Sequence, residues 1–310
     1  MGIKVCCFST LKVILRQGII LDFPKMANFV TNHKKPYAAL SPAHPGRSLA
    51  GKSVFITGAG RGVGEHITHG LAAAGPSRIG ILGRDKSRIE NAKAKFAKEY
   101  PGTAFSAYSV DILDETGIAA VFKDFGAPDI LINNAGHFPD EGPFIKQELK
   151  SWFSGFEINI LGTAIVTQKY LQAKGAEKPG VVLNVSSMAA HMRFPLVGWS
   201  GYNGSKMGQT RIFENIRFEH PEVRFISIHP GNIESDGFTR SGASAPPGGM
   251  TDGKLAGQFF AWAATTESDF LSGRFVWAEW DITELKAKKD EILKKDLLLT
   301  TIDGFDRGFF

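Results

Sequence analysis

Short apolar runs alternate with amphipathic stretches along the chain from residue 51 onward. Runs of this length, flanked by glycine, asparagine or charged residues, are typical of strands buried on both faces of a sheet. The stretches between them carry apolar side chains at helical spacing, as Ile89 and Phe96 do. Because crossovers between parallel strands are right-handed, the pattern predicts an α/β fold, a single doubly wound parallel sheet of about seven strands with helices on both faces. The expected strands are residues 53–56, 79–82, 103–108, 130–132, 181–185, 223–228 and 274–277.

Three segments lie outside this alternation. Residues 26–50 are rich in proline and predict an extended arm on the domain surface. Residues 235–253 are rich in glycine, serine and proline and predict a mobile loop. Residues 284–295 mix both charges at helical spacing, which is typical of a solvated helix. The expected domains are an N-terminal arm or leader (1–50), one α/β domain (51–280) and a C-terminal helical tail (281–310).

The first 25 residues admit more than one interpretation. Four basic residues stand there against the single acid Asp22, and a basic, acid-poor leader is typical of a mitochondrial transit peptide, although the usual Arg- and Ser-rich composition is lacking. Arg16 and Gln17 interrupt the apolar stretch, which makes a poor secretory signal. We therefore expect translation to begin at Met26, after a misplaced gene start. That expectation places the protein in the cytoplasm, whereas a genuine transit peptide would place it in mitochondria.

The composition excludes several classes of protein. The 310 residues are 43% hydrophobic and 22% charged, which is not the composition of a disordered, collagen-like or coiled-coil chain. The net charge is +5, but no basic block with interleaved aromatic residues occurs, so nucleic acid is not an expected partner. No uncharged apolar run is long enough to predict a membrane span. The adjacent Cys6 and Cys7 predict a reducing compartment and neither a disulfide framework nor a metal site.

A glycine-rich turn follows the first strand of the domain and opens a helix. It reads Thr57-Gly58-Ala59-Gly60-Arg61-Gly62-Val63-Gly64. Glycines let the backbone approach a pyrophosphate closely, and a helix N-terminus offers free N–H groups and a partial positive charge. In the common Gly-x-Gly-x-x-Gly motif, counted from Gly58, the third glycine would fall at residue 63, where this chain has Val63. The turn instead fits the motif Gly-x-x-x-Gly-x-Gly. The turn fits a phosphate cradle, and a tight turn that binds no ligand is the alternative.

Further segments follow this turn in a specific order. Asn133-Asn134-Ala135-Gly136 comes directly after a strand, Asn159 lies in the next helix, and Ser186-Ser187 ends a later strand. Tyr202 and Lys206 are four residues apart and so share one face of a helix. A lone Tyr-x-x-x-Lys is common by chance, whereas the ordered set is specific. Over about residues 51–280 the chain resembles the short-chain dehydrogenase/reductase family, and its tail resembles that of a fungal branch.

The resemblance implies an oxidoreductase that reduces a ketone or oxidises a secondary alcohol with a nicotinamide cofactor. Tyr202 would be the general acid/base, because the nearby ammonium of Lys206 lowers the pKa of a phenol from its usual value near 10. By the family's pattern, Lys206 also binds the nicotinamide ribose and Ser187 binds the substrate oxygen. Asn159 would hold a water that relays protons to Lys206. Ser186 stays an alternative to Ser187.

The end of the second strand of the domain bears on the choice of cofactor. NAD-specific sites place a carboxylate there to bind the ribose 2′-hydroxyl. Here Gly83 stands at that position and Arg84 follows, while the family places Arg61 beside the same ribose. Two guanidinium groups suit a 2′-phosphate, so NADP(H) is expected; for Arg84 the alternative is a surface pair with Asp85. The expected cofactor-binding residues are Gly58, Arg61, Gly62, Val63, Gly64, Arg84, Asp111, Asn133, Ala135, Gly136, Tyr202, Lys206, Gly231, Ile233 and Ser235.

The substrate side of the expected site is less specific. Ser235, after His229-Pro230-Gly231, stands where the family usually has a threonine that contacts the nicotinamide amide, and the loop after it is expected to close over the substrate. Ser187 and Tyr202 are 15 residues apart, more than the family usually shows, which leaves the shape of the pocket open. The bulky candidates predict a hydrophobic ketone, with core or lid packing as the alternative. They are His137, Phe138, Met188, His191, Phe194, Trp199 and Phe238.

Two other functions compete with a reductase. Gly198-Trp199-Ser200-Gly201 comes near the nucleophile elbow of a serine hydrolase, but Tyr202 replaces the last glycine and no strand leads into it. A non-catalytic NADP-binding or scaffolding protein of the same fold stays an alternative. Family members usually pair through the helices that carry Asn159 and Tyr202, so a homodimer or homotetramer is expected.

Overall fold

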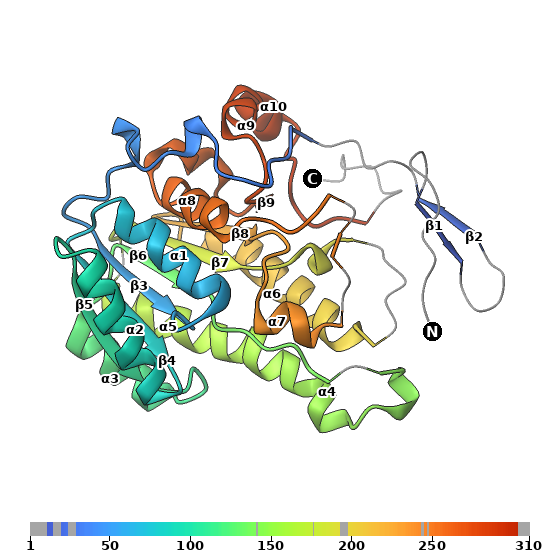
Figure 1. Ribbon diagram of the computed structural model, residues 1–310, viewed down its shortest axis with the longest axis horizontal. Helices are drawn as coiled ribbons and strands as arrows, with labels where there is room; N and C mark the ends of the chain where they lie inside the picture. The colour runs from blue at the N-terminus through green and yellow to red at the C-terminus, as the bar shows by residue number, and fades with distance from the viewer. Residues whose placement is uncertain are drawn as a thin grey trace.

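The computed structural model describes residues 11–14, 20–23, 29–140, 142–175, 177–192, 198–242, 245–246 and 248–302. Its centre is a sheet of seven parallel strands with helices on both faces (Figure 1). The two ends of each expected strand lie within one residue of the ends of an observed strand. The predicted single doubly wound sheet is therefore confirmed. In spatial order the strands are β5 (Ala104–Ser109), β4 (Arg78–Gly83), β3 (Ser53–Thr57), β6 (Ile130–Asn133), β7 (Gly180–Val185), β8 (Val223–His229) and β9 (Phe275–Trp277).

Alternate residues of the strands contribute to two apolar cores, one on each face of the sheet. In β3, Val54 and Ile56 belong to one core and Phe55 belongs to the other, as the two-residue period of a strand requires. Because both faces are buried, each strand appears in the sequence as a continuous apolar run. The first core packs against α1 (Gly62–Ala73), α2 (Lys86–Glu99) and α8 (Gly253–Ala263). The second packs against α3 (Glu115–Phe125), α5 (Thr163–Lys174) and α6 (Ser200–Glu219).

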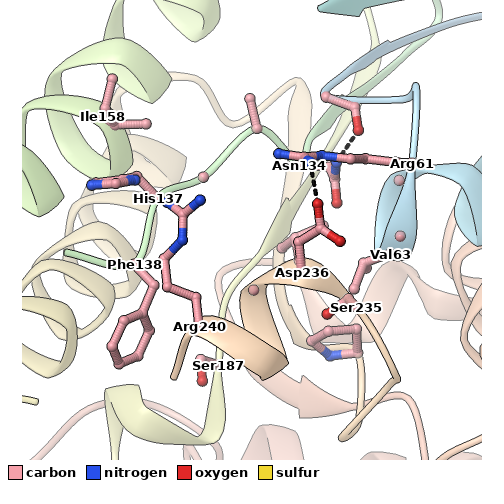
Figure 2. A pocket seen from close by; sticks show the side chains of 18 of the residues that line it. Arg61, Val63, Asn134, His137, Phe138, Ile158, Ser187, Ser235, Asp236 and Arg240 are labelled. Atoms are coloured by element: carbon pink, nitrogen blue, oxygen red, sulfur yellow. Dashed lines mark hydrogen bonds and ion pairs between the residues drawn. The ribbon is translucent and has the colours of Figure 1, made fainter. Parts of the chain in front are cut away.

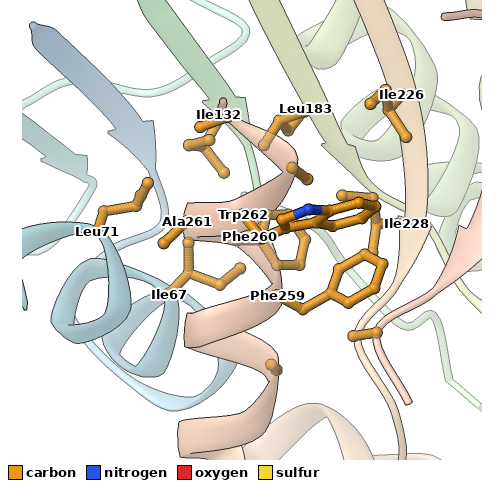
Figure 3. Packing of buried hydrophobic residues seen from close by; sticks show 14 of the residues in the cluster. Ile67, Leu71, Ile132, Leu183, Ile226, Ile228, Phe259, Phe260, Ala261 and Trp262 are labelled. Carbon is orange, nitrogen blue, oxygen red and sulfur yellow. The ribbon is translucent and has the colours of Figure 1, made fainter. Parts of the chain in front are cut away.

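The largest side chains of the first core come from α8. Phe259, Phe260 and Trp262 are fully buried, and Figure 3 shows them packed beside the strand residues Leu183 and Ile228. Full burial of one phenylalanine contributes roughly 1.5–3 kcal/mol. Since α8 follows the loop at residues 235–253, this packing anchors the far end of that loop to the sheet.

Glycines allow α1 and α8 to approach each other closely. A Cβ added at Gly70 would lie 2.1 Å from the backbone of Gly257, and one added at Gly257 would lie 2.2 Å from the carbonyl oxygen of His66. Backbone atoms cannot move aside as the end of a flexible side chain can, so these positions exclude any side chain. The contact holds α1, which begins at the glycine-rich turn, against the core of the sheet.

Residues 29–50 are packed into the domain more deeply than a surface arm would be. Leu40 and Leu49 are buried, and the guanidinium of Arg47, which is 1% exposed, forms an ion pair with Glu267. These residues find buried partners because the segment runs beside the C-terminal part of the chain (Figure 1). The division of the chain at residue 50 stays a prediction.

Small elements lie near both ends of the chain. An antiparallel hairpin formed by β1 (Leu11–Ile14) and β2 (Ile20–Phe23) has no counterpart in the sequence-based expectations. The C-terminal segment forms α9 (Ile282–Ala287) and α10 (Lys289–Lys294), where a solvated helix was expected. Ile282, Leu285 and Ile292 are fully buried, so the apolar residues of these helices dock on the first core while their charges face water.

In the part of the chain that the structure describes, no helix is long and apolar enough to cross a membrane. No three His, Cys, Asp or Glu side chains in that part are grouped as a metal site requires.

Shorter helices connect the main elements. The connecting elements are α4 (Leu149–Phe156), a π-helix (Glu157–Gly162), α7 (Asp236–Arg240) and 3₁₀ turns at Ala38–Leu40, Pro45–Arg47, Phe144–Lys146, Met188–Ala190 and Thr266–Leu271.

The contact between α1 and α8 leads to a test of stability. Gly70→Ala should destabilise the protein by about 1–3 kcal/mol, because the added methyl group overlaps the backbone of Gly257. Urea unfolding measures the change. Gly102→Ala is the control, since nothing lies within 4 Å of a Cβ at that position. Equal stability of the two variants would show that the helices separate at no cost.

Candidate active site

A cavity of about 800 Å³ lies where the strand order reverses between β3 and β6 (Figure 2). In doubly wound sheets, ligands bind at this reversal, outside the carboxyl ends of the strands. Most of the sequence-predicted site residues border this one cavity. They are Gly58, Arg61, Gly62, Val63, Gly64, Arg84, Asp111, Ala135, Gly136, His137, Phe138, Ser187, Met188, Trp199, Tyr202, Lys206, Gly231, Ile233, Ser235 and Phe238.

The glycine-rich turn forms one end of the cavity. Gly62, with a φ of 55°, begins α1, and a Cβ at Gly64 would lie 2.1 Å from the carbonyl oxygen of Gly58. Asn134 holds the turn in place, since its side-chain nitrogen donates to the carbonyl oxygens of Thr57 and Gly58, both at 2.9 Å. The first turn of α1 thus directs its unpaired N–H groups toward the cavity. This cradle fits the pyrophosphate of a dinucleotide.

Asn133, which was expected to contact the cofactor, does not reach the cavity. It is the last residue of β6, and its side-chain nitrogen donates to the hydroxyl of Thr167 at 2.8 Å. Neighbouring side chains at a strand end point to opposite sides. The asparagine that faces the cavity is therefore Asn134, which the sequence analysis did not select.

Two arginines stand at the same end as the glycine turn. Arg61 forms an ion pair with Asp236 on α7, as Figure 2 shows. A nitrogen of the Arg84 guanidinium lies 3.7 Å from a carboxylate oxygen of Asp111. The alternative partner of Arg84, Asp85, instead caps the N-terminus of α2. Both guanidinium groups are largely exposed, so an anion entering this end of the cavity can reach them.

Tyr202, which lies on α6, also borders the cavity. Its phenol shares a hydrogen bond with the hydroxyl of Ser187, and the rings of Phe138 and Trp199 pack around it with centroid distances of 4.5 Å and 6.0 Å. Burial raises the pKa of Tyr202 above its ordinary value of 10.0, and the hydrogen bond to Ser187 opposes that rise. The phenol is consequently protonated at neutral pH.

Lys206 lies one helical turn further along α6 and is 4% exposed. Its amine donates to the carbonyl oxygen of Val185 at 2.9 Å and to the side-chain oxygen of Gln209 at 3.1 Å. Burial lowers the pKa of Lys206 from 10.5 to about 7. The sequence argument expected the charge of Lys206 to lower the pKa of Tyr202. The structure corrects this, because burial acts on both groups and drives each toward its neutral form.

The two adjacent serines after β7 differ in their surroundings. The hydroxyl of Ser186 is buried and lies 2.8 Å from the hydroxyl of Thr210 on α6. The hydroxyl of Ser187 faces Tyr202 and accepts a hydrogen bond from the backbone N–H of Ala189 at 3.2 Å. Of the two, Ser187 is the serine whose hydroxyl is directed to the phenol.

Asn159 lies in the π-helix between α4 and α5, and such segments often occur at functional sites. It is fully buried and does not border the cavity. Its side-chain oxygen accepts from the backbone N–H of His137 at 2.8 Å, and its nitrogen donates to the carbonyl of His137 and the hydroxyl of Ser205, both at 2.9 Å. The observed contacts are those of a residue that positions His137.

The expected substrate contacts are only partly brought together. His137, Phe138, Met188, Trp199 and Phe238 line the cavity. His191 does not, because its ring accepts a hydrogen bond from the indole N–H of Trp277 at 3.1 Å and lies against Phe275. Phe194 lies outside the described residues.

The charged residues of the cavity wall that the sequence analysis missed include two on one short helix. Asp236 and Arg240 both lie on α7, inside the segment that its composition marked as a mobile loop. The start of α7 carries a recognisable signal, since Ser235 caps it by accepting from the backbone N–H of Phe238 at 3.2 Å. An acid follows that cap, as is usual at a helix start.

Comparisons with known proteins agree with this geometry. The family model described as short chain dehydrogenase matches residues 52–245. The chain belongs to this family. A short chain dehydrogenase/reductase of Claviceps purpurea is 33% identical over 276 residues, which cover 87% of this chain and 92% of that protein. Further relatives come from Aspergillus and Monascus, so the expected fungal branch is confirmed as well.

Solved structures share the fold of this short-chain dehydrogenase/reductase. A 7α-hydroxysteroid dehydrogenase complexed with NADH and 7-oxo glycochenodeoxycholic acid has a TM-score of 0.66 at 22% identity and covers 79% of this chain and 97% of its own. A Pseudomonas aeruginosa RhlG/NADP complex has a TM-score of 0.66 at 24% identity, with coverages of 76% and 97%. The chain is an oxidoreductase of the family with a dinucleotide-binding, Rossmann-like fold.

The buried amine of this short-chain dehydrogenase/reductase makes stability depend on pH. The folded pKa of Lys206 is about 7 and lies below its ordinary value of 10.5, so the cost of burying the charge is fully present below pH 7 and disappears as the pH rises to 10.5. Lys206→Met removes this cost. Its stability relative to the wild type should therefore be highest at or below pH 7 and decrease above it.

Urea unfolding between pH 6 and pH 9.5, without coenzyme, measures that difference. The lost hydrogen bonds to Val185 and Gln209 shift all values by a similar amount and leave the pH trend intact. Lys98→Met, on the exposed side of α2, controls for the loss of a surface charge. A difference that is constant over this pH range would contradict the lowered pKa of Lys206.

Proposed function

We propose that this protein uses NADP(H) to reduce a ketone, or to oxidise the corresponding secondary alcohol, on a hydrophobic small molecule. The observation that carries the proposal is the arrangement of the cavity: Tyr202, Ser187 and Lys206 border it together with a glycine-rich helix N-terminus. A bound reduced nicotinamide supplies the hydride. The chain supplies the proton donor and the groups that hold the carbonyl oxygen.

Tyr202 is the proposed general acid. Burial keeps its phenol protonated, as a donor to an oxygen that gains negative charge must be. Ser187 is already hydrogen-bonded to that phenol, so an oxygen bound between them accepts a hydrogen bond from each hydroxyl. The raised pKa of Tyr202 therefore favours the direction of reduction at neutral pH.

Lys206 is proposed to bind the nicotinamide ribose and to return a proton to Tyr202. An ammonium has three donors, and two are used on Val185 and Gln209, which leaves one for a ribose hydroxyl. A pKa of about 7 suits proton exchange near neutrality. Asn159 supports this relay, because it lies near Lys206 across Gly136. A Cβ added at Gly136 would lie 3.2 Å from the side-chain oxygen of Asn159 and 3.7 Å from the amine of Lys206.

The arginines support NADP(H) as the coenzyme. Arg61 and Arg84 stand at the end of the cavity that holds the glycine turn. An NAD-binding site usually has a carboxylate at the end of this strand, and here the residue at that position is the uncharged Gly83. Their exposed carboxylate partners, Asp236 and Asp111, contribute little to stability and can be exchanged for a phosphate.

The lining near Tyr202 supports a hydrophobic substrate. Phe138 and Trp199 pack at right angles to each other, 4.9 Å apart, and both contact the ring of Tyr202. Met188 and Phe238 complete this apolar wall. Flat or polycyclic ketones match such a surface, because ring faces can stack on it.

A homodimer or homotetramer in the cytoplasm is part of the same proposal. Phe153, Leu161, Met207 and Phe218 are at least half exposed on α4, the π-helix and α6, and the family pairs through these helices. Exposed apolar side chains of this number are typical of a surface covered by another subunit. The alternative, a non-catalytic NADP-binding protein, shares all of these features and is separated by the following test.

Tyr202→Phe should lower kcat for ketone reduction by about 10²–10⁴-fold, because the proton donor is lost while the ring is kept. Binding of NADPH should be retained. Tyr108→Phe, whose phenol lies outside the cavity, serves as the control. Tight NADPH binding by the wild type without turnover on a broad panel of carbonyls and alcohols would instead establish the binding protein.

Coenzyme choice is tested at Gly83. The wild type should have a KM for NADPH that is at least about tenfold below that for NADH, as expected where two guanidinium groups bind a phosphate. Gly83→Asp should remove most of that preference by repelling the 2′-phosphate. The substitution fits, since the nearest atom to a Cβ at this position is 3.5 Å away, in Ile89. Gly83→Asn has the same size without the charge, and it should keep the preference; equal KM values in the wild type would refute the assignment.

A further inference from the structure

Five basic side chains line the cavity, and one of them differs from the rest. Arg61, Arg84 and Arg88 each have a carboxylate no farther than 3.7 Å away. Lys206 donates to two neutral oxygens. Arg240 forms no ion pair with any carboxylate in the described parts of the chain. A guanidinium does not lose its proton in proteins, so Arg240 presents a full positive charge to the cavity.

The neighbour expected to neutralise Arg240 is engaged elsewhere. Asp236 precedes Arg240 by four residues on α7, a spacing at which opposite charges usually pair on a helix. Its carboxylate instead bonds to Arg61 at the glycine turn. Asp236 therefore pairs with Arg61 and not with Arg240, which has no ion-pair partner on its own helix.

Arg240 is directed toward His137. Figure 2 shows its side chain running from α7 toward the imidazole. The pKa of His137 is lowered, chiefly by burial and next by the charge of Arg240, with Arg84 acting in the same sense and Asp140 opposing them. The backbone N–H and carbonyl of His137 are both hydrogen-bonded to the side chain of Asn159. A fixed, neutral imidazole donor therefore stands beside an unpaired guanidinium.

The acids near this place do not cancel the positive charge. Asp140 is exposed and accepts a hydrogen bond from Ser151 at 2.8 Å. Glu157 also lines the cavity, but it is exposed and is not among the charges that shift the pKa of His137. The region between His137 and Arg240 is consequently positive, while the adjoining wall, formed by Phe138 and Trp199, is apolar.

We propose that Arg240 is a specificity-determining residue that binds a carboxylate of the substrate, with His137 as a second donor. The substrate would then be a hydrophobic keto acid, with its ketone at Tyr202 and its carboxylate at Arg240. This inference rests on the proposed function, because it names the substrate class of the same cavity. A guanidinium binds a carboxylate through two parallel hydrogen bonds, a geometry that a neutral ester or amide does not reproduce.

The test uses pairs of ligands that differ in one group. NADP⁺-loaded protein is titrated with 4-phenylbutanoate and 4-phenylbutanamide, and with 2-naphthoate and 2-naphthamide, by calorimetry. In the wild type each carboxylate should bind at least about tenfold more tightly than its amide. Arg240→Gln should abolish this ratio and leave the binding of the amides unchanged, and Arg240→Lys should restore part of it. Thr239→Gln, an exposed neighbour on α7, should keep the full ratio.

Equal binding of carboxylates and amides by the wild type would overturn the proposal, and so would a ratio that survives in Arg240→Gln. If Arg240→Gln weakened only the binding of NADP⁺, the guanidinium would serve the coenzyme and the proposal would also be wrong. None of these outcomes touches the proposed function. That function fails separately, when no ketone, neutral or acidic, shows turnover that depends on Tyr202.

Discussion

The burial of Lys206 is the constraint on which the site depends. Its amine is taken out of water and held by neutral oxygens of Val185 and Gln209, so its pKa falls to about 7. A buried charge without a carboxylate lowers stability, and the aromatic core under α8 offsets this cost on the other face of the sheet. The same burial raises the pKa of Tyr202 and keeps its phenol protonated. Removing the pair from water thus supplies both a proton donor and an amine that exchanges protons near neutrality.

Strand ends decide which polar side chains reach the cavity. At the ends of β6 and β7 the sequence has two polar residues in succession, Asn133 with Asn134 and Ser186 with Ser187. In both pairs the first side chain bonds to a threonine of a covering helix. Asn134 borders the cavity and Asn133 does not. Both serines border it, and Ser187 is the one hydrogen-bonded to the phenol of Tyr202. For the asparagines the reason is the two-residue alternation of a strand, because Asn133 is the last residue of β6 and Asn134 follows it. The sequence analysis selected Ser187, whose hydroxyl faces the phenol of Tyr202, and Asn133, which does not border the cavity.

The sheet could be predicted almost to the residue because its strands are buried on both faces and leave continuous apolar runs. The contacts of the site could not, since they join distant parts of the chain: Arg61 and Asp236 are 175 residues apart. Burial of Tyr202 and Lys206 likewise arises from packing that no local pattern encodes. The helix α7 was hidden by a loop-like composition, and its local signals are the cap at Ser235 and the acid Asp236 that follows it.

The two charges of α7 connect the ends of the cavity. Asp236 bonds to Arg61 at the glycine turn, and Arg240 extends toward His137. An anion that binds Arg61 competes with Asp236 for the guanidinium, and an anion that binds Arg240 pairs with a charge that has no carboxylate partner in the described chain. Under the proposed function, the coenzyme phosphate would compete with Asp236 for Arg61 and the substrate carboxylate would pair with Arg240, so both ligands would act on the same short helix.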